Sequence, residues 1–222
     1  GYTLRQIFKL FATNDVCTEE ELWDAAANHD FQYEFLGPDT LGDKYRLEGF
    51  LFPDTYTFYK GDQPARVINK MLVNFNEKFK AEYITRAAEL GYSVRDIINI
   101  AAMIEREAGD DDDDRDMIAS VIYNRLNSNS LKRLQIDATI HYAIAETGEA
   151  FSKEVDSPYN TYKVEGLPAV PIANPGMASI RAALYPQKSG YYYYALNKQG
   201  THNFFRDYDA HQAFVQSDKY GG

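Results

Sequence analysis

The sequence predicts an α+β fold that is mainly helical and carries one β-hairpin late in the chain. Apolar residues recur at helical spacing through most of the chain, which is typical of helices packed around a core. Two short aromatic runs, 191–196 and 202–205, flank the turn-forming residues 197–200 and predict the hairpin. With 222 residues, 45% of them hydrophobic and 25% charged, the chain can fold as one large domain or two small ones.

The first region, residues 1–46, is expected to be small and helical. Apolar side chains recur on one face from Leu4 to Phe11. Thr18 is followed by three glutamates and predicts a second helix, because its hydroxyl can cap the helix and the acids suit the positive end of the helix dipole. The next stretch, 47–59, is aromatic and interrupted by Gly and Pro, so we expect loop and short extended pieces there.

The second and larger region, residues 47–222, is expected to begin its helices at Pro64, since proline suits the first turn of a helix. One apolar face continues from there without Gly or Pro as far as Gly91, so a single long helix is predicted between them. A capping box at Ser93 precedes a nearly all-apolar helix at about 94–108. Such a helix should lie at the centre of the core.

A second core helix is predicted at about 116–127, where one face is apolar. Shorter helices are predicted over 137–145 and 177–184, and a last helix follows the hairpin from about Asp209. Between them the stretch 157–176 is dense in Pro, Gly, Asn and Tyr, which predicts an ordered loop.

Composition and motifs exclude several classes of function. The net charge of −10 gives no field that would attract nucleic acid, so we expect no nucleic-acid partner. Cys17 is the only cysteine, which rules out an internal disulfide. The four histidines form no metal-binding pattern, and the acidic run Asp110–Asp114 lacks the ligand spacing of a calcium loop. Glycine patterns that bind phosphates or dinucleotides are absent as well, so we expect neither a metal nor a cofactor.

The sequence contains no run of about 20 apolar residues of the kind that spans a membrane. It begins directly within a helical pattern. We therefore expect the chain to be part of a longer protein, whose remaining sequence could carry targeting information.

Glu105 and Glu107 close the apolar helix and are the strongest candidates for catalysis. At 100° per residue they lie about 160° from one another, one on each flank of the apolar stripe. A carboxylic acid beside apolar walls has a raised pKa and can donate a proton near neutral pH, as a general acid at a glycosidic oxygen must. On spacing alone, simple solvation of the helix end by either residue is the more common arrangement.

A group of polar and aromatic residues suits sugar recognition, because hydroxyls need short hydrogen-bonding partners and sugar rings stack on aromatic rings. Its members are Gln135, Asp137, Thr139, Tyr159, Asn160 and Tyr162. Composition also allows simpler interpretations: Asp137 as a helix N-cap, and the tyrosines as loop packing.

Five separated motifs, found in one order, resemble the endolytic murein transglycosylase family, also called MltG or YceG-like. These motifs are Glu48–Tyr56, Ile104–Ala108, Ala119–Leu126, Leu134–Thr139 and Tyr159–Gly176. The resemblance covers the chain from about Glu48 to His211. It implies that 47–222 is a YceG-like catalytic region and that 1–46 is a remnant of, or a link to, a LysM-like subdomain.

The resemblance implies a lyase that cuts the β-1,4 bond between MurNAc and GlcNAc within glycan strands and leaves 1,6-anhydroMurNAc ends. One glutamate would act first as acid and then as base. Matching the family motif places this glutamate at Glu107, with Glu105 as the alternative. The six polar and aromatic residues above would bind the sugar.

The resemblance also implies a place and partners in the cell. Members of the family act at the extracytoplasmic face of the bacterial cell membrane and carry an N-terminal membrane helix that this sequence lacks. Their partners would be glycan strands and the penicillin-binding synthases that make them. Two other functions stay open: a hydrolytic muramidase with Glu107 as acid and Asp137 as second carboxylate, and a glycan-binding module of the cell wall without activity.

Overall fold

The computed structural model describes residues 1–37, 39–108 and 114–221, and within them it has the mainly helical α+β fold that the sequence predicts. The predicted acidic run at 110–114 lies outside these residues apart from Asp114. The helices are α1 (Leu4–Thr13), α2 (Glu19–Asn28), the short 3-10 helix η1 (Glu34–Leu36), α3 (Pro64–Lys78), α4 (Ala81–Leu90), α5 (Val94–Ala108), α6 (Arg115–Leu126), α7 (Asp137–Ile144), α8 (Met177–Leu184) and α9 (Tyr208–Val215). The strands are β1 (Tyr193–Leu196) and β2 (His202–Phe205).

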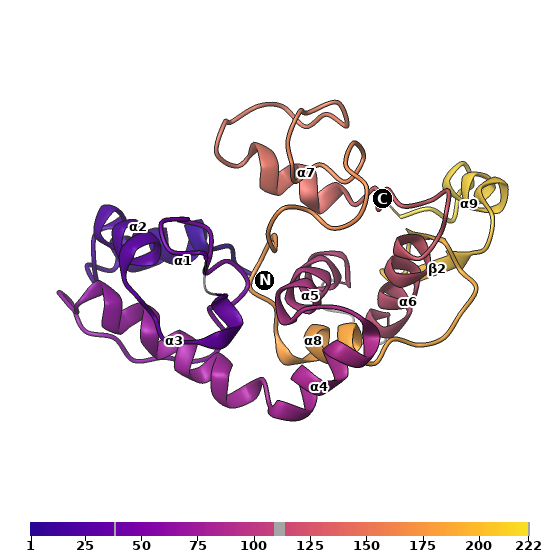
Figure 1. Cartoon of the computed structure of the whole chain (residues 1–222). Helices are drawn as coiled ribbons and strands as arrows, with labels where there is room; N and C mark the ends of the chain where they lie inside the picture. Colours follow the sequence, from indigo (N-terminus) through magenta and orange to yellow (C-terminus); the bar gives the residue numbers. More distant parts are fainter. Residues whose placement is uncertain (38, 109–113, 222) are drawn as a thin grey trace.

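The N-terminal helices begin as their sequences predict. A capping box opens α1 at Thr3 and another opens α2 at Thr18, so two backbone N–H groups at each helix start have side-chain partners. The predicted absence of regular structure over 47–59 is confirmed. Figure 1 shows α1, α2 and α3 gathered in one part of the molecule and α5, α6 and α8 in another.

The single long helix predicted from Pro64 to Gly91 is wrong, because the chain breaks into α3 and α4 at Phe79 and Lys80. The ring of Phe79 stays buried and stacks on Phe75 at 5.3 Å between ring centroids. The two helices pack on different neighbours: α3 lies against α2, and α4 lies against α5 and α8. One straight helix could not follow both sets of partners, which explains a break without Gly or Pro.

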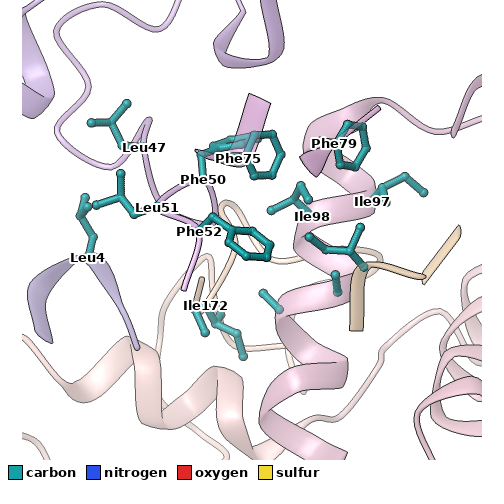
Figure 2. Packing of buried hydrophobic residues seen from close by; sticks show 14 of the residues in the cluster. Leu4, Leu47, Phe50, Leu51, Phe52, Phe75, Phe79, Ile97, Ile98 and Ile172 are labelled. Atoms are coloured by element: carbon teal, nitrogen blue, oxygen red, sulfur yellow. The ribbon is translucent and has the colours of Figure 1, made fainter. Parts of the chain in front are cut away.

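Helix α5 forms the centre of the core, as predicted. In Figure 1 α5 lies between α7 and α8. The second predicted core helix is α6, which begins and ends one residue earlier than expected. Figure 2 shows Leu4, Phe50 and Ile172, which come from distant parts of the chain, in the same hydrophobic cluster as Ile98 of α5. Because one hydrophobic cluster runs through both parts of the molecule, the division into 1–46 and 47–222 stays a prediction.

The predicted hairpin is confirmed, although its first strand begins at Tyr193 rather than Tyr191. The strands are antiparallel, with Tyr193 opposite Phe205 and Leu196 opposite His202. Helix α9 packs on both strands, and α6 packs on β1, so the hairpin is held against the end of the core.

Glu48 is a buried carboxylate that joins three separate segments. The backbone N–H of Leu4 and the side-chain amide of Asn174 donate to its Oε1 at 2.8 and 3.1 Å, and the hydroxyl of Tyr142 donates to Oε2 at 2.9 Å. Only 1% of the residue is exposed. Burial raises the pKa of Glu48 from 4.5 to about 7, even though these hydrogen bonds favour the charged form.

Gly49 occupies a position that only glycine fits. Its φ is +91°, and a Cβ there would lie 2.6 Å from Cγ2 of Ile98 and 2.8 Å from Cγ of Pro171. We expect Gly49→Ala to lower the free energy of unfolding by about 3 kcal/mol, through backbone strain and overpacking together. Gly61→Ala is the matched control, since Gly61 has φ of +76° but open space around it, and it should cost only about 1 kcal/mol. Urea denaturation measures both, and equal losses would contradict the packing argument.

The raised pKa of Glu48 should make stability depend on pH. Its pKa is about 7 in the folded state and 4.5 when unperturbed, so the folded protein binds more protons between these values and loses stability as the pH rises through them. Glu48→Gln stays neutral and avoids this loss. Relative to the variant, the wild type should therefore lose up to about 3 kcal/mol between pH 4 and 8, as measured by denaturation at several pH values. The exposed Glu77→Gln is the control, and an identical pH profile for Glu48→Gln and wild type would disprove the assignment.

Candidate active site

The carboxyl group of Glu107 lies where the end of α5 meets the hairpin. The hydroxyl of Tyr194, on β1, donates a hydrogen bond to Oε2 of Glu107 at 2.7 Å. Both side chains are half-buried. Strand β1 places Tyr194 there because it is held by β2 on one edge and packs against α6.

The pKa of Glu107 is raised above its ordinary value. Burial is the main cause, since it disfavours the charged carboxylate, and the nearby negative charge of Asp137 adds to it. The hydrogen bond from Tyr194 acts in the opposite direction, as do the charges of His202 and Arg106. A carboxyl group of this kind can hold a proton at a pH where an ordinary glutamate has lost it.

Glu105 has a different environment on the other flank of α5. Ser179 donates to its Oε2 at 2.5 Å, and the backbone N–H of Gly176 donates to the same oxygen at 3.2 Å. Burial acts to raise the pKa of Glu105, but hydrogen bonds to the charged form, that from Ser179 foremost, act against it, and the pKa is lowered. Glu105 is thus an ionised carboxylate at the N-terminus of α8, where the helix dipole favours negative charge.

The predicted placement of these glutamates on opposite flanks of the helix is confirmed. Glu107 points towards the hairpin, and Glu105 points towards α8. Of the two, Glu107 is the one whose environment favours the protonated form.

Asp137 and Tyr162 form a second pair on the same side of the molecule as Glu107. The hydroxyl of Tyr162 donates to Oδ1 of Asp137 at 2.5 Å. Asp137 is the first residue of α7 and is exposed, whereas the N-cap is Ile136, so the alternative of Asp137 as an N-cap is wrong. Its carboxylate is therefore exposed at the start of α7, with Oδ1 held by Tyr162.

Gln135 is exposed and has a φ of +58°, a left-handed conformation that is uncommon for a residue with a side chain. Its Oε1 accepts a hydrogen bond of 2.7 Å from Nη2 of Arg125. The same guanidinium donates to the carbonyl oxygens of Arg133 and Tyr192 at 2.6 and 3.1 Å. Arg125 thus ties the Gln135 segment to the strand that carries Tyr194.

Three predicted sugar-binding residues do not join this group. Thr139 and Asn160 are fully buried, with 0% of each exposed, so they cannot touch a substrate in this conformation. Thr139 hydrogen-bonds to Thr161 at 3.0 Å, and Asn160 binds the carbonyl oxygen of Val155 at 2.7 Å, so both shape the loop. Tyr159 packs edge-on against Tyr142, with ring centroids 5.0 Å apart. It therefore lies beside the Glu48 cluster, meaning Glu48 and its hydrogen-bond partners Leu4, Tyr142 and Asn174, rather than beside Glu107.

Sequence reasoning missed several residues of the site. Tyr194 lies in a run of four tyrosines, and nothing in that run distinguishes the one that faces Glu107. His202 is held by Asp114, whose Oδ2 lies 2.9 Å from its Nδ1, and its ring packs edge-on against Tyr194 at 5.5 Å. Arg125 is a charged residue on a predicted core helix, and such a residue needs buried hydrogen-bond partners. That pattern could have indicated Arg125 as a residue that organises the site.

Two other kinds of feature are absent from the described residues. Within 1–37, 39–108 and 114–221, no three His, Cys, Asp or Glu side chains come close enough to hold a metal ion. No helix in this part of the chain has both the length and the apolar character needed to cross a membrane.

The sequence and the fold both match one known family. The model of the YceG-like family matches residues 1–217, and the chain belongs to that family. A crystal structure of a yceG-like protein, lmo1499 from Listeria monocytogenes, has a TM-score of 0.79 and 34% identity, and the match covers 96% of this chain and 73% of that one.

Two curated relatives carry a more particular name, endolytic murein transglycosylase. The one from Bacillus subtilis is 38% identical over 173 residues, which cover 73% of this chain and 47% of the relative. The one from Streptococcus pneumoniae strain D39 is 32% identical over 220 residues, which cover 89% of this chain and 39% of the relative. The chain therefore spans less than half the length of the curated relatives it matches.

The two glutamates should titrate in a fixed order. Glu107 should lose its proton above pH 4.5 and Glu105 below it, because burial is the main influence on Glu107, whereas hydrogen bonds from Ser179 and Gly176 offset burial at Glu105. Carbon-13 NMR of the side-chain carboxyl groups measures this, with the signals assigned through Glu105→Gln and Glu107→Gln. The reverse order would show that the two environments are wrongly described.

Proposed function

We propose that this chain is the catalytic part of an endolytic murein transglycosylase, with Glu107 as its acid and base. The observation that carries the proposal is the Glu107 carboxyl group, which has a raised pKa and lies at the end of an apolar helix beside Tyr194. A general acid needs a pKa close to the working pH. The names of the two curated relatives support the same activity.

In the first step, the protonated carboxyl group of Glu107 gives its proton to the β-1,4 oxygen between MurNAc and GlcNAc. The bond from C1 of MurNAc to that oxygen breaks, and its electron pair stays on the oxygen, which becomes the 4-hydroxyl of GlcNAc. Positive charge then develops at C1 and the ring oxygen. The carboxylate of Asp137 would stabilise this charge, which its exposure and its electrostatic influence on Glu107 support.

In the second step, Glu107 is a carboxylate and acts as base. It takes the proton from the C6 hydroxyl of MurNAc while the oxygen of that hydroxyl bonds to C1. The product is a 1,6-anhydroMurNAc end, the glutamate returns to its protonated form, and no water is consumed. A single residue whose pKa lies above that of an ordinary glutamate suits both steps.

Substrate binding is assigned to the exposed and half-exposed residues near the acid. Gln135, Asp137 and Tyr162 are supported by their positions in the segments that border Glu107. The buried Thr139 and Asn160 would act indirectly by shaping the loop. Tyr159 would contact the glycan only if the strand extended as far as the Glu48 cluster.

A hydrolytic muramidase is the second candidate, and one observation favours it. Hydrolysis needs a second carboxylate, either to activate a water molecule or to bind the sugar covalently. Asp137 is an exposed carboxylate whose charge acts on Glu107, so a carboxylate is available for that role. The reaction products distinguish the two, because hydrolysis adds one water and the anhydro product lacks it.

The cellular setting is part of the same proposal. Murein lies outside the cytoplasmic membrane, so we propose that the chain works on that side of the membrane. Anchoring through a membrane helix elsewhere in a longer protein, and cooperation with penicillin-binding synthases, stay predictions.

Mass spectrometry of uncrosslinked glycan strands incubated with the protein tests the activity and its acid together. The wild type should give internal fragments that end in 1,6-anhydroMurNAc. Glu107→Gln keeps the shape of the side chain but cannot donate the proton, so it should fold normally and lose activity by at least about 100-fold. Glu105→Gln is the matched variant two residues away and should keep most of the activity.

Other outcomes would change the assignment. Loss of activity in Glu105→Gln alone would move the acid to Glu105. Fragments heavier by one water would turn the function to hydrolysis. Strand binding without any cleavage would favour the glycan-binding module.

A further inference from the structure

We propose that Tyr194 is a positioning residue that holds Oε2 of Glu107 and so makes Oε1 the oxygen that carries the proton in both steps. This inference rests on the proposed function. The hydroxyl of Tyr194 donates to Oε2 at 2.7 Å, which restricts the rotation of the carboxyl group.

Tyr194 is itself firmly placed. It pairs with Phe204 across the hairpin. Its ring packs edge-on against His202, with ring centroids 5.5 Å apart, and His202 is in turn fixed by Asp114, which accepts from both its backbone N–H and its ring. Burial raises the pKa of Tyr194 well above 10, so its hydroxyl keeps its proton and remains a donor wherever the protein is folded.

The other oxygen of Glu107 is left open. Within the described residues Oε2 accepts the hydrogen bond from Tyr194, and Oε1 accepts none. Glu107 is half-buried rather than buried, so part of the residue reaches the surface. The oxygen that Tyr194 does not hold is the one that a glycosidic oxygen can approach.

The groups that act on the charge of Glu107 come from four elements. Asp137 on α7 raises the pKa, and His202 on β2, Arg106 on α5 and Tyr194 on β1 lower it. Among these groups, Tyr194 alone donates a hydrogen bond to the carboxyl group. It therefore stabilises the carboxylate at the moment when Glu107 gives up its proton.

The test is to titrate Glu107 by carbon-13 NMR in the wild type and in Tyr194→Phe. Loss of a hydrogen bond to the charged form should raise the pKa of Glu107 by about one pH unit. The high-pH limb of the pH profile for strand cleavage, which reports the loss of the Glu107 proton, should move in the same direction. We expect kcat to fall about 10-fold to 100-fold while KM changes little, because Oε1 is no longer held in place.

A replacement that strengthens the donor separates this role from simple packing. Incorporation of 3-fluorotyrosine at position 194 keeps the ring and makes the hydroxyl more acidic. Because the hydroxyl then donates a stronger hydrogen bond to the carboxylate, the pKa of Glu107 should fall by about 0.3. A purely structural tyrosine would not shift the pKa in opposite directions with these two changes. Tyr191→Phe, which removes a hydroxyl from a half-buried tyrosine outside the site, is the control and should leave the titration of Glu107 unchanged.

The outcomes are distinct from those that test the proposed function. If Tyr194→Phe leaves both the pKa of Glu107 and kcat as in the wild type, the proposal about Tyr194 is overturned even where the activity is established. If the wild type cleaves no strand but Tyr194→Phe still shifts the pKa of Glu107, the pairing holds and the proposed function fails.

Discussion

Burial of helix α5 is the constraint on which the rest of the structure depends. Every residue from Ile97 to Ile104 is buried, Asn99 among them, so the helix must be covered around its whole circumference. Helices α4, α6, α7 and α8 and the segment around Phe50 provide that cover. The first turn of α5 is half-buried, and so is part of the last turn, which carries both glutamates. The same burial that stabilises the fold therefore fixes where acid chemistry can occur.

The two glutamates illustrate how one helix end can hold carboxylates of opposite character. Glu105 is compensated by donors at the start of α8, as an anion at a helix N-terminus commonly is. Glu107 receives one neutral donor and lies beside another negative charge. The donors around Glu105 stabilise the fold. The environment of Glu107 does not fully offset the free energy of ionising its carboxyl group, and perturbed pKa values of this kind are common among catalytic acids and bases.

Elements with a local sequence signal were predicted correctly. The prediction was wrong where packing between distant segments determines the structure. Capping residues and apolar spacing predicted α1, α2 and α5. The break at Phe79 had no local signal, because it follows from the different neighbours of α3 and α4. Likewise, helical geometry separated Glu105 from Glu107, but their different environments depend on Ser179 and Tyr194, which lie 74 and 87 residues along the chain. Burial of Thr139 and Asn160 had the same non-local origin.

The Glu48 cluster has a consequence for the order in which the protein folds. Its hydrogen bonds join Glu48 to Leu4, Tyr142 and Asn174, which are separated from it by 44, 94 and 126 positions in the sequence. None of these hydrogen bonds can therefore form between neighbouring parts of the chain. Closing loops of this length costs entropy that is recovered only once both ends are packed. We therefore expect these hydrogen bonds to form late in folding. Interactions that form after the transition state slow unfolding more than they accelerate folding.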